Sequence, residues 1–466
     1  MRSIARSAPA MNYDSAISAL YALGQELAAA TPRKFDLDHM RALMDAMGHP
    51  ERRFPSVLVA GTNGKGSTSA TLASILNTAG YRAALYTSPH LTRVNERIQI
   101  DGQPISDGEF TEIYGRVNTV AERLVQQGAL PHPPSFFETL TAMAFEYFAS
   151  AGIEIAVLEV GMGGRLDATN VTDPCLAVIT DIALDHQQYL GNTVAEIARE
   201  KAGIIRRGGV VVTLPQHPAA NDVIGHTCLE REARAVSAAP YVPNVSPGAS
   251  VFEQLRPTAQ PSSAFRRSRY FLEVLGEEVL VETPLLGRHQ LRNVALAIAA
   301  AVELKECGFP VTAQQIAEGV RETAWPGRFQ QIHAGPGMPE FIVDVAHNPA
   351  GAWALRSALS EYLAERPITM VFGAMRDKAV QEMAEILFPV AEHVVLTQAH
   401  TPRAATPQEM AALAERVGTP MSMAAEVKQA IAAAAEHAGK SGVVVVAGSI
   451  YVAGEALAAL GAAPRP

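Results

Sequence analysis

The chain has 466 residues, which is too long for one ordinary domain and predicts two or three. Its composition, 48% hydrophobic and 18% charged, is globular, and its net charge of −9 excludes a general attraction to nucleic acid or anionic membranes, so any anion site must be local. The three cysteines, Cys175, Cys228 and Cys307, lie far apart without metal-ligand spacing, and no run of about 20 apolar residues predicts a membrane span, so we expect a cytoplasmic protein.

Strands and helices alternate along the first half of the chain. Residues 1–11 carry charge without an apolar segment and are expected to be disordered. Helices are predicted at 67–79, 135–150 and 193–204. Short apolar strands are predicted at Val57–Ala60, Ala83–Tyr86, Ile155–Val160, Leu176–Thr180 and Val210–Leu214. The alternation is typical of an α/β domain in which helices cover both faces of a parallel sheet.

The middle of the chain is less regular. Residues 216–268 are rich in Pro, Ser and Ala without a sustained period, and we interpret them as irregular, partly helical surface. Two alternating segments, Tyr270–Val274 and Glu278–Glu282, flank Gly276-Glu277 and predict a β-hairpin. A long helix is predicted to follow from about Arg288 to Glu306.

A break at Trp325-Pro-Gly-Arg328 is taken as the domain boundary, which divides the chain into residues 1–326 and 327–466. A second alternation begins after it. Its strands are predicted at Phe341–Val345, Ile368–Phe372, His393–Thr397 and Val443–Ala447, and its helices at 349–365, 379–391, 406–417 and 424–438. About 140 residues is a typical size for one domain, so we predict a smaller Rossmann-like α/β domain here.

Residues 57–67 combine an apolar strand, a glycine-rich turn and the start of a helix. In that context backbone N–H groups and the helix dipole hold phosphate, and glycines permit a close approach of the backbone. Lys65 supplies a cation for the β- and γ-phosphates, and Ser67 a hydroxyl for phosphate or Mg²⁺. Gly66 stands between them, unlike the usual G-x-x-x-x-G-K-[ST], which indicates a group narrower than the common NTPases. The alternative is a glycine-rich turn with a solvated lysine.

Polar residues follow the ends of the neighbouring strands. Glu159, His186 and the segment Tyr86–Leu91 stand at the carboxyl ends of predicted parallel strands, where ligands bind in open α/β sheets. A buried carboxylate has to reach solvent or a cation, so Glu159 is either a rim residue or a Mg²⁺ ligand beside the phosphate loop. His186 is either a structural histidine or, with Asp185 beside it, a metal or phosphate contact. We favour the ligand role for both residues.

Three other positions stay open on the residues alone. Lys201 lies between Glu200 and an apolar Ala-Gly-Ile-Ile run, where a lysine is most often solvated. His289 and Asn293 are spaced i and i+4, so they share one face of a helix. Such a pair fits ordinary capping and surface polarity as well as it fits a ligand contact.

Together and in this order, these segments resemble the folylpolyglutamate synthase and dihydrofolate synthase family of the Mur ligase superfamily. The resemblance runs from about residue 14 to residue 455. The matching segments are Gly61-Thr-Asn-Gly-Lys-Gly-Ser67, Thr87-Ser-Pro-His-Leu91, Leu158–Asn170, Leu184-Asp-His186, Glu200–Ile204, Pro326–Phe329, Asp344–Pro349 and Gly448-Ser449. The resemblance implies a P-loop, parallel-sheet ATPase domain like the Mur ligase central domain, followed by a Rossmann-like glutamate-ligase domain.

The family implies an ATP-dependent, ADP-forming amide ligase of folate biosynthesis and one-carbon metabolism. The carboxylate of dihydropteroate or of a reduced folate attacks the γ-phosphate of ATP, and the amino group of L-glutamate then displaces phosphate from the acyl phosphate. Because ATP and the carboxylate are both anionic, cations have to neutralise their repulsion. By position, the resemblance assigns ATP binding to Thr62, Asn63, Gly64, Lys65, Gly66, Ser67, Asn293, Arg328 and Asp344.

Two Mg²⁺ ions are implied as cofactors, with no organic cofactor. The resemblance assigns them to Ser88, Glu159, His186 and Lys201, and it makes Lys65, Lys201, His186 and Glu159 the catalytic residues. Lys201 matches the modified lysine of the family. An ammonium beside two metal ions is pushed towards neutrality, and reaction with CO₂ would make it a carbamate that ligates metal.

The pterin site of the family is formed by a segment before the phosphate loop and by an aromatic helix start. The matching residues are Phe35, Asp36, Leu37, Ser135, Phe136, Phe137, Glu138, Leu166, Asp167 and Ala168. We expect one of the two phenylalanines to be a core residue of the helix. The chain departs from the family at Ala379, where an acidic residue is expected after Asp377-Lys378, and in the length of residues 236–268. These departures bear on glutamate binding.

Two other functions are weighed. A cell-wall Mur ligase shares the phosphate loop and the modified lysine, but it carries a separate domain for a nucleotide-linked substrate, and about 56 residues before the loop are too few for one. A catalytically idle P-loop module would not require Lys65, Glu159, His186 and Asp344 together. We expect a monomer that binds ATP, L-glutamate and a pterin-linked carboxylate but neither nucleic acid nor membrane. Which acceptor is preferred, and how long the glutamate chain grows, stay open.

Overall fold

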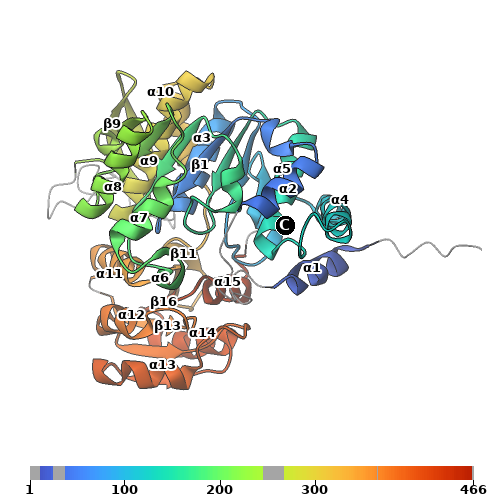
Figure 1. The fold of residues 1–466 in the computed structure, drawn as a ribbon. Helices are drawn as coiled ribbons and strands as arrows, with labels where there is room; N and C mark the ends of the chain where they lie inside the picture. The colour runs from blue at the N-terminus through green and yellow to red at the C-terminus, as the bar shows by residue number, and fades with distance from the viewer. Residues whose placement is uncertain (1–10, 25–36, 245–266, 365, 464–466) are drawn as a thin grey trace, which may run out of the picture.

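The computed structural model describes residues 11–24, 37–244, 267–364 and 366–463 of the chain. The expectation of disorder for residues 1–11 therefore falls almost wholly outside the described residues. Two sheets organise the molecule (Figure 1). The larger one is built by the first two thirds of the chain, and the smaller one, in orange and red, packs below it.

The larger sheet has the strand order β4-β3-β2-β5-β1-β6-β7-β8. The strands from β2 to β8 in this order run parallel, as predicted, whereas β3 and β4 form an antiparallel edge that was not predicted. Their bounds are β1 Ser56–Ala60, β2 Ala83–Tyr86, β3 Ile98–Ile100, β4 Gln103–Pro104, β5 Ile155–Glu159, β6 Leu176–Ile179, β7 Val210–Thr213 and β8 Arg234–Ser237.

Helices cover both faces of this sheet, because its central strands are apolar on both sides. In β1, Leu58 and Ala60 belong to one core, and Val57 and Val59 to the other. The first core is completed by α1 Tyr13–Ala22, α2 Asp38–Ala46, α4 Asp107–Gln126, α5 Phe136–Ala151, α7 Val194–Ala202 and α8 Pro218–Glu230. The second is completed by α3 Lys65–Thr78, α9 Arg288–Glu303, α10 Ala313–Arg321 and the predicted hairpin, β9 Ser268–Val274 with β10 Glu277–Thr283.

Residues 216–268, interpreted as irregular, partly helical surface, are described at 216–244 and 267–268. The helical part is confirmed by α8, whereas the edge strand β8 was not predicted. Every residue of β8 is exposed or half-buried, so the strand lacks the apolar run that marks the central strands. A polar edge strand pairs through its backbone and leaves little trace in the sequence.

The smaller sheet has the order β11-β12-β16-β13-β14-β15, with β11 antiparallel to the rest. The four predicted strands are present, and β11 and β15 were not predicted. The strands are β11 Gln330–His333, β12 Glu340–Val343, β13 Ile368–Phe372, β14 His393–Leu396, β15 Met421–Met423 and β16 Val443–Ala447. The helices are the four predicted, α11 Pro349–Leu363, α12 Val380–Leu387, α13 Pro407–Ala414 and α14 Val427–Ala438, together with α15 Ile450–Ala459. The division of the chain at residues 326 and 327 stays a prediction; it separates the strands of the two sheets.

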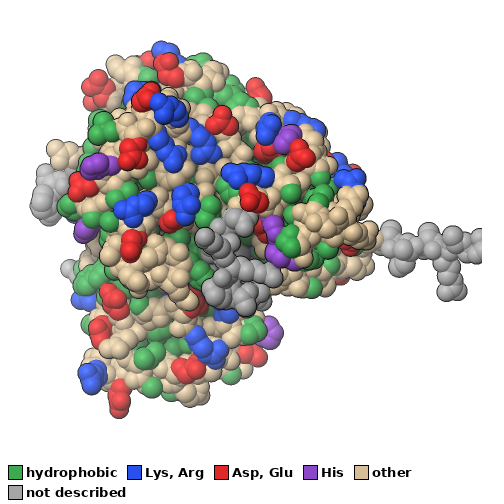
Figure 2. Space-filling view, viewed as in Figure 1, with side chains coloured by type: hydrophobic (Ala, Val, Ile, Leu, Met, Phe, Trp, Pro, Cys, Tyr) green, Lys and Arg blue, Asp and Glu red, His purple; other side chains and the backbone are tan. Residues whose placement is uncertain are grey.

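The two parts touch along α9, α11, α15 and the loop after β2. A Cβ at Gly454 of α15 would lie 2.0 Å from the carbonyl oxygen of Leu91, so helix and loop are in direct contact. None of the described helices is long and apolar enough to cross a membrane. Acidic and basic side chains are interspersed over the face shown in Figure 2.

Candidate active site

A cavity of about 1830 Å³ is lined by both parts of the chain. It exceeds the roughly 300–1,000 Å³ of a site for one drug-sized ligand, so it has room for two substrates. Most of the residues that the sequence assigned to ATP, metal and pterin line it. They are Thr62, Asn63, Gly64, Lys65, Gly66, Ser67, Ser88, Ser135, Phe136, Phe137, Glu138, Glu159, Leu166, Asp167, Ala168, His186, Lys201, Asn293, Arg328 and Asp344. Phe35 and Asp36 lie outside the described residues, and Leu37 is buried at the start of α2 rather than lining the cavity.

The phosphate loop joins β1 to α3, and hydrogen bonds to the segment that follows β6 hold it in place. The backbone N–H groups of Thr62 and Asn63 donate to the carbonyl of Asp181 at 2.8 and 3.2 Å, and the hydroxyl of Thr62 donates to the carbonyl of Ala183 at 3.0 Å. Thr62 therefore shapes the loop through its own hydrogen bonds. Lys65 begins α3, and its Nζ donates to the carbonyl of Thr62 at 3.3 Å, within the loop.

The glycine at position 64 is required by its conformation and its surroundings. Gly64 has φ of 85°, which other residues rarely adopt, and a Cβ there would lie 2.1 Å from Oδ1 of Asn293. Asn293 of α9 thus lies directly against the loop, and its Nδ2 donates to Gln290 Oε1 at 2.9 Å. The sequence left Asn293 open between a surface and a ligand role; the structure places it in the cavity wall.

Glu159 ends β5 as a buried carboxylate that is 4% exposed. The backbone N–H of Ser88 donates to its Oε2 at 3.2 Å, which brings these two predicted metal ligands together. Burial raises the pKa of Glu159 to about 7, because the charges of Lys65, Arg328 and Arg97 offset the loss of water only in part. Because the nearby positive charges do not fully compensate the buried carboxylate, binding of a further cation beside Glu159 would stabilise its charged form.

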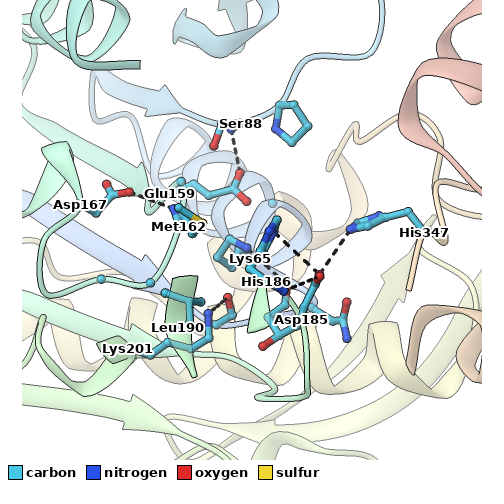
Figure 3. A pocket seen from close by; sticks show the side chains of 18 of the residues that line it. Lys65, Ser88, Glu159, Met162, Asp167, Asp185, His186, Leu190, Lys201 and His347 are labelled. Atoms are coloured by element: carbon cyan, nitrogen blue, oxygen red, sulfur yellow. Dashed lines mark hydrogen bonds and ion pairs between the residues drawn. The ribbon is translucent and has the colours of Figure 1, made fainter. Parts of the chain in front are cut away.

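Asp185, which follows β6, receives contacts from residues of the C-terminal part of the chain, which holds the smaller sheet (Figure 3). Lys378 Nζ lies 2.8 Å from its Oδ1, and Asn348 Nδ2 donates to its Oδ2 at 3.1 Å. His186 and His347 approach the same carboxylate at 3.9 Å. Burial acts to raise the pKa of Asp185, but these facing groups hold it below its ordinary value.

Three of these residues were missed by the sequence reasoning. Asn348 and His347 lie in a segment that was recognised, Asp344–Pro349, of which only Asp344 was assigned a role. Lys378 was noted only as a landmark before Ala379. The available signal was position, since each follows a strand of the smaller sheet at its carboxyl end. Asn348 Nδ2 also donates to Asn63 Oδ1 at 3.0 Å, so it joins the smaller domain to the phosphate loop.

His186 faces the loop from a left-handed backbone conformation with φ of 52°. Burial lowers its pKa to about 4, and the positive charges of Lys378 and Lys65 act in the same direction, against Asp185. The imidazole is therefore neutral at neutral pH, which is the form that binds a metal ion.

Lys201 of α7 is 4% exposed, and its Nζ donates to the carbonyl of Gly61 at 2.7 Å. The solvated position that lysines usually take is thereby excluded. Burial lowers its pKa to about 7, with help from the charge of Lys65. A large share of the side chain is neutral amine near pH 7, and the neutral amine is the form that reacts with CO₂.

Arg328 and Asp344 bring charge from the linker and the smaller sheet. Asp344 accepts the backbone N–H groups of Phe329 and Ala346, both at 2.8 Å, so its carboxylate holds the linker against the end of β12. Burial lowers the pKa of Arg328, while Asp344 and Glu159 act to raise it. The charges of two buried carboxylates therefore act on Arg328 in the cavity wall.

The two adjacent phenylalanines at the start of α5 have different surroundings. Phe136 is 3% exposed, stacks on Tyr21 at 5.4 Å and lies under the Arg97 guanidinium, so it is the core residue of the pair. Phe137 is half-buried, and a Cβ at Gly161 would lie 2.5 Å from its ring. The glycine leaves room for the tip of this ring, which lines the cavity.

Most of the polar side chains predicted for the pterin site already make hydrogen bonds within the protein. Ser135 and Glu138 cap α5 reciprocally, with hydrogen bonds of 2.8 and 3.3 Å. Asp167 accepts the backbone N–H groups of Met162 and Thr169 at 2.9 and 3.0 Å. These side chains position the loop and the helix start, and a direct pterin contact by them stays a prediction.

Among the described residues, no group of three or more His, Cys, Asp or Glu side chains is placed to hold a metal ion. The predicted ligands Glu159 and Ser88 do lie together, and His186 faces Lys65 across the same space (Figure 3). The donors are a carboxylate, a hydroxyl and a neutral imidazole. The two oxygen donors, from Glu159 and Ser88, suit Mg²⁺, which usually completes its shell with substrate phosphates and water, and His186 adds one nitrogen donor.

Known proteins resemble this chain over nearly its whole length. The family model for the Mur ligase middle domain matches residues 59–301, and that for the Mur ligase glutamate ligase domain matches residues 327–450. The dihydrofolate synthase/folylpolyglutamate synthase of Bacillus subtilis is 36% identical over 417 residues, covering 89% of this chain and 92% of its own. The chain belongs to this family of Mur ligases.

Solved structures of the family have the same fold. Mycobacterium tuberculosis folylpolyglutamate synthase complexed with ADP and AMPPCP has a TM-score of 0.81 at 31% identity, covering 97% of this chain and 100% of that one. Escherichia coli FolC in complex with DHPP and ADP has a TM-score of 0.79 at 28% identity, covering 97% of this chain and 98% of that one. The predicted fold class and family are therefore confirmed.

Proposed function

We propose that this chain is an ATP-dependent, ADP-forming ligase that joins L-glutamate to the carboxylate of dihydropteroate or of a reduced folate. One observation carries the proposal: a single cavity brings the phosphate loop together with Arg328, His347 and Lys378. Membership of the family supports the same reaction class. The names and bound molecules of the relatives, which include ADP, AMPPCP and DHPP, support ATP and a pterin acceptor as substrates.

The residues of this chain suit the transfer of a phosphoryl group to a carboxylate. The first turn of α3 presents backbone N–H groups to the β- and γ-phosphates, and Lys65 needs only to leave the carbonyl of Thr62 to reach them. Arg328 would approach the same phosphates from the linker. These cations stabilise the charge that develops when an anionic carboxylate attacks the γ-phosphate.

The second half of the reaction needs a free amine near the acyl phosphate. Glutamate carries carboxylates that cations attract, and Lys378, which pairs with Asp185 in the wall contributed by the smaller domain, is our candidate for this contact. His347 is half-buried, and partial loss of water together with the charge of the nearby Lys378 lowers its pKa, which favours the neutral imidazole at neutral pH. A neutral imidazole can accept a proton from the ammonium of glutamate, which frees the amine that attacks the acyl phosphate.

We propose that two Mg²⁺ ions act as cofactors, held by Ser88, Glu159, His186 and a carbamate of Lys201. The buried Glu159, with its pKa near 7, and the lowered pKa of Lys201 both support this set. Bound Mg²⁺ would neutralise phosphate charge and orient the γ-phosphate. We also propose that the chain acts as a cytoplasmic monomer, since its cysteine content fits a reducing compartment.

The test is a turnover assay with purified protein, ATP, Mg²⁺ and L-glutamate, run separately with dihydropteroate and with tetrahydrofolate. We expect ADP release that depends on both the acceptor and glutamate, and products heavier by one glutamyl unit in mass spectrometry. Chelation of Mg²⁺ should stop both. ATP hydrolysis that proceeds equally without acceptor would contradict the proposal, and comparison of the two acceptors decides their preference.

A further inference from the structure

The linker between the two sheets is anchored once in each core, by residues at the two ends of a five-residue segment. Trp325 packs against the core formed by α3, α9 and α10, whereas Phe329 belongs to the core of the smaller sheet. Gly327 and Phe329 have φ of 72° and 47°, so the chain turns sharply between the two anchors. Arg328, a predicted ATP contact, lies on this turn.

Trp325 also lies directly on the phosphate loop. A Cβ at Gly66 would be 2.8 Å from Cζ2 and 3.0 Å from Nε1 of the indole. Gly66 lies within α3, so its backbone does not itself require glycine. The glycine between Lys65 and Ser67, which sets this loop apart from the common pattern, is therefore explained by the ring packed upon it.

The indole of Trp325 also contacts the side chain of Arg328. The guanidinium carbon of Arg328 lies 5.9 Å from the centroid of the indole, within the range of a cation–π interaction. Nε1 of Trp325 is buried and has no hydrogen-bond partner among the described residues. An unsatisfied buried donor disfavours the folded state, so stability alone would favour phenylalanine over tryptophan here.

We propose that Trp325 is a positioning residue that couples the phosphate loop to the linker. The indole transmits the position of the first turn of α3 to Arg328, so that both sides of the nucleotide site are aligned together. The inference rests on the proposed function for the identity of the nucleotide. Trp325 itself does not line the cavity, so its role is exerted through Gly66 and Arg328.

The coupling is tested by a double-mutant cycle on ATP binding, measured by calorimetry with Gly66→Ala, Trp325→Ala and the double variant. Gly66→Ala should weaken binding roughly tenfold, because the added methyl group displaces the ring. Trp325→Ala should weaken it by a similar factor, and the double variant should bind no more weakly than Trp325→Ala alone. Losses that multiply in the double variant would overturn the proposal.

Two variants serve as controls. Gly115→Ala adds the same methyl group inside α4, where nothing lies within 4 Å, and should leave ATP binding unchanged. Trp325→Phe keeps a ring on Gly66 and should bind ATP within about twofold of the parent, since coupling depends on contact. In turnover, Trp325→Ala should raise the KM for ATP but not that for glutamate. An equal loss for both substrates points to a general loss of structure and contradicts the proposal.

A second measurement does not depend on the folding of the alanine variants. The chain has two tryptophans, so Trp353→Phe leaves Trp325 as the only fluorophore of its kind. ATP should then change its emission in proportion to occupancy, and an unchanged emission at saturating ATP would overturn the proposal. A parent that binds ATP without forming glutamylated product contradicts the proposed function instead, and leaves the binding cycle interpretable.

Discussion

Replacing Glu159 by glutamine should stabilise the ligand-free protein above neutral pH while it removes ligase activity. Glutamine keeps the shape of the side chain and an oxygen that can accept the Ser88 N–H, now at 3.2 Å. It removes only the buried charge. The same substitution should therefore raise the stability of the protein and lower its activity, whereas a substitution that merely damages the fold would lower both.

The magnitude follows from the raised pKa. Burial moves the pKa of Glu159 from 4.5 to about 7, so between these values the folded state holds a proton that the unfolded state has released. Stability of the parent therefore falls as pH rises through this window and stays lower above it. At about 1.36 kcal/mol per unit, the difference between variant and parent approaches about 3 kcal/mol at pH 8 and is small near pH 5.

The assay is thermal unfolding of both proteins in EDTA, from pH 5 to pH 8. Lys201, whose lowered pKa gives stability that rises with pH above about 7, is common to both proteins and cancels in the difference. We expect the variant to gain several degrees over the parent at pH 8. Mg²⁺ should stabilise the parent more than the variant. A variant that is no more stable at pH 8, or whose advantage does not change with pH, would refute the reasoning.

Three further predictions follow from the cavity. Lys65→Ala should lower kcat by about 10²–10³-fold with an unchanged melting temperature; near-normal turnover would remove Lys65 from the phosphate site. Native mass spectrometry of freshly prepared protein should find Lys201 carrying one added CO₂, and short carboxylic acids should partly restore Lys201→Ala, whereas an unmodified lysine with ATP and Mg²⁺ bound would count against the carbamate. Phe137→Ala should raise the KM for the pterin acceptor roughly tenfold with little effect on ATP, whereas Phe136→Ala should instead lose about 3–5 kcal/mol of stability; a reversed pattern would move the pterin contact to Phe136.

The central strands and the phosphate loop were predictable because their signals are local. Strands such as β1 and β5 are apolar on both faces, so each appears in the sequence as a short uninterrupted run. The phosphate loop follows from one strand, one turn and one helix start in sequence order. Such patterns need no knowledge of the rest of the chain.

Other elements were missed although the sequence carried a signal. Helix α4 spans 20 residues and begins with a capping box in which Ser106 and Glu109 bond each other's backbone. That spacing of serine and glutamate is a recognisable helix start. Strand β8, by contrast, is short, has no buried residue and lies at the sheet edge, so its pairing with β7 depends on the fold around it.

Some residues of the candidate site were likewise predictable from local patterns, and others depend on contacts distant in sequence. Glu159 and His186 were predicted from their place at strand ends, since parallel strands bring these ends to one edge. Of Phe136 and Phe137, the sequence could say only that one is buried, because both stand in the first turn of the same helix. The two are distinguished by residues distant in sequence, since Phe136 stacks on Tyr21 whereas Phe137 approaches Gly161.

Contacts between the two parts of the chain could not be predicted from local sequence patterns, because they join residues far apart in the sequence. These contacts determine how the site is assembled. Asn348 Nδ2 donates both to Asn63 in the phosphate loop and to Asp185, 285 and 163 residues away in the chain. Lys378 reaches the same Asp185 across 193 residues. The amide and the ammonium therefore hold the smaller domain against the loop that is expected to bind phosphate and against the strand end that carries His186. Because one carboxylate receives both donors, a shift of the smaller domain would disturb the loop and the predicted metal ligand together.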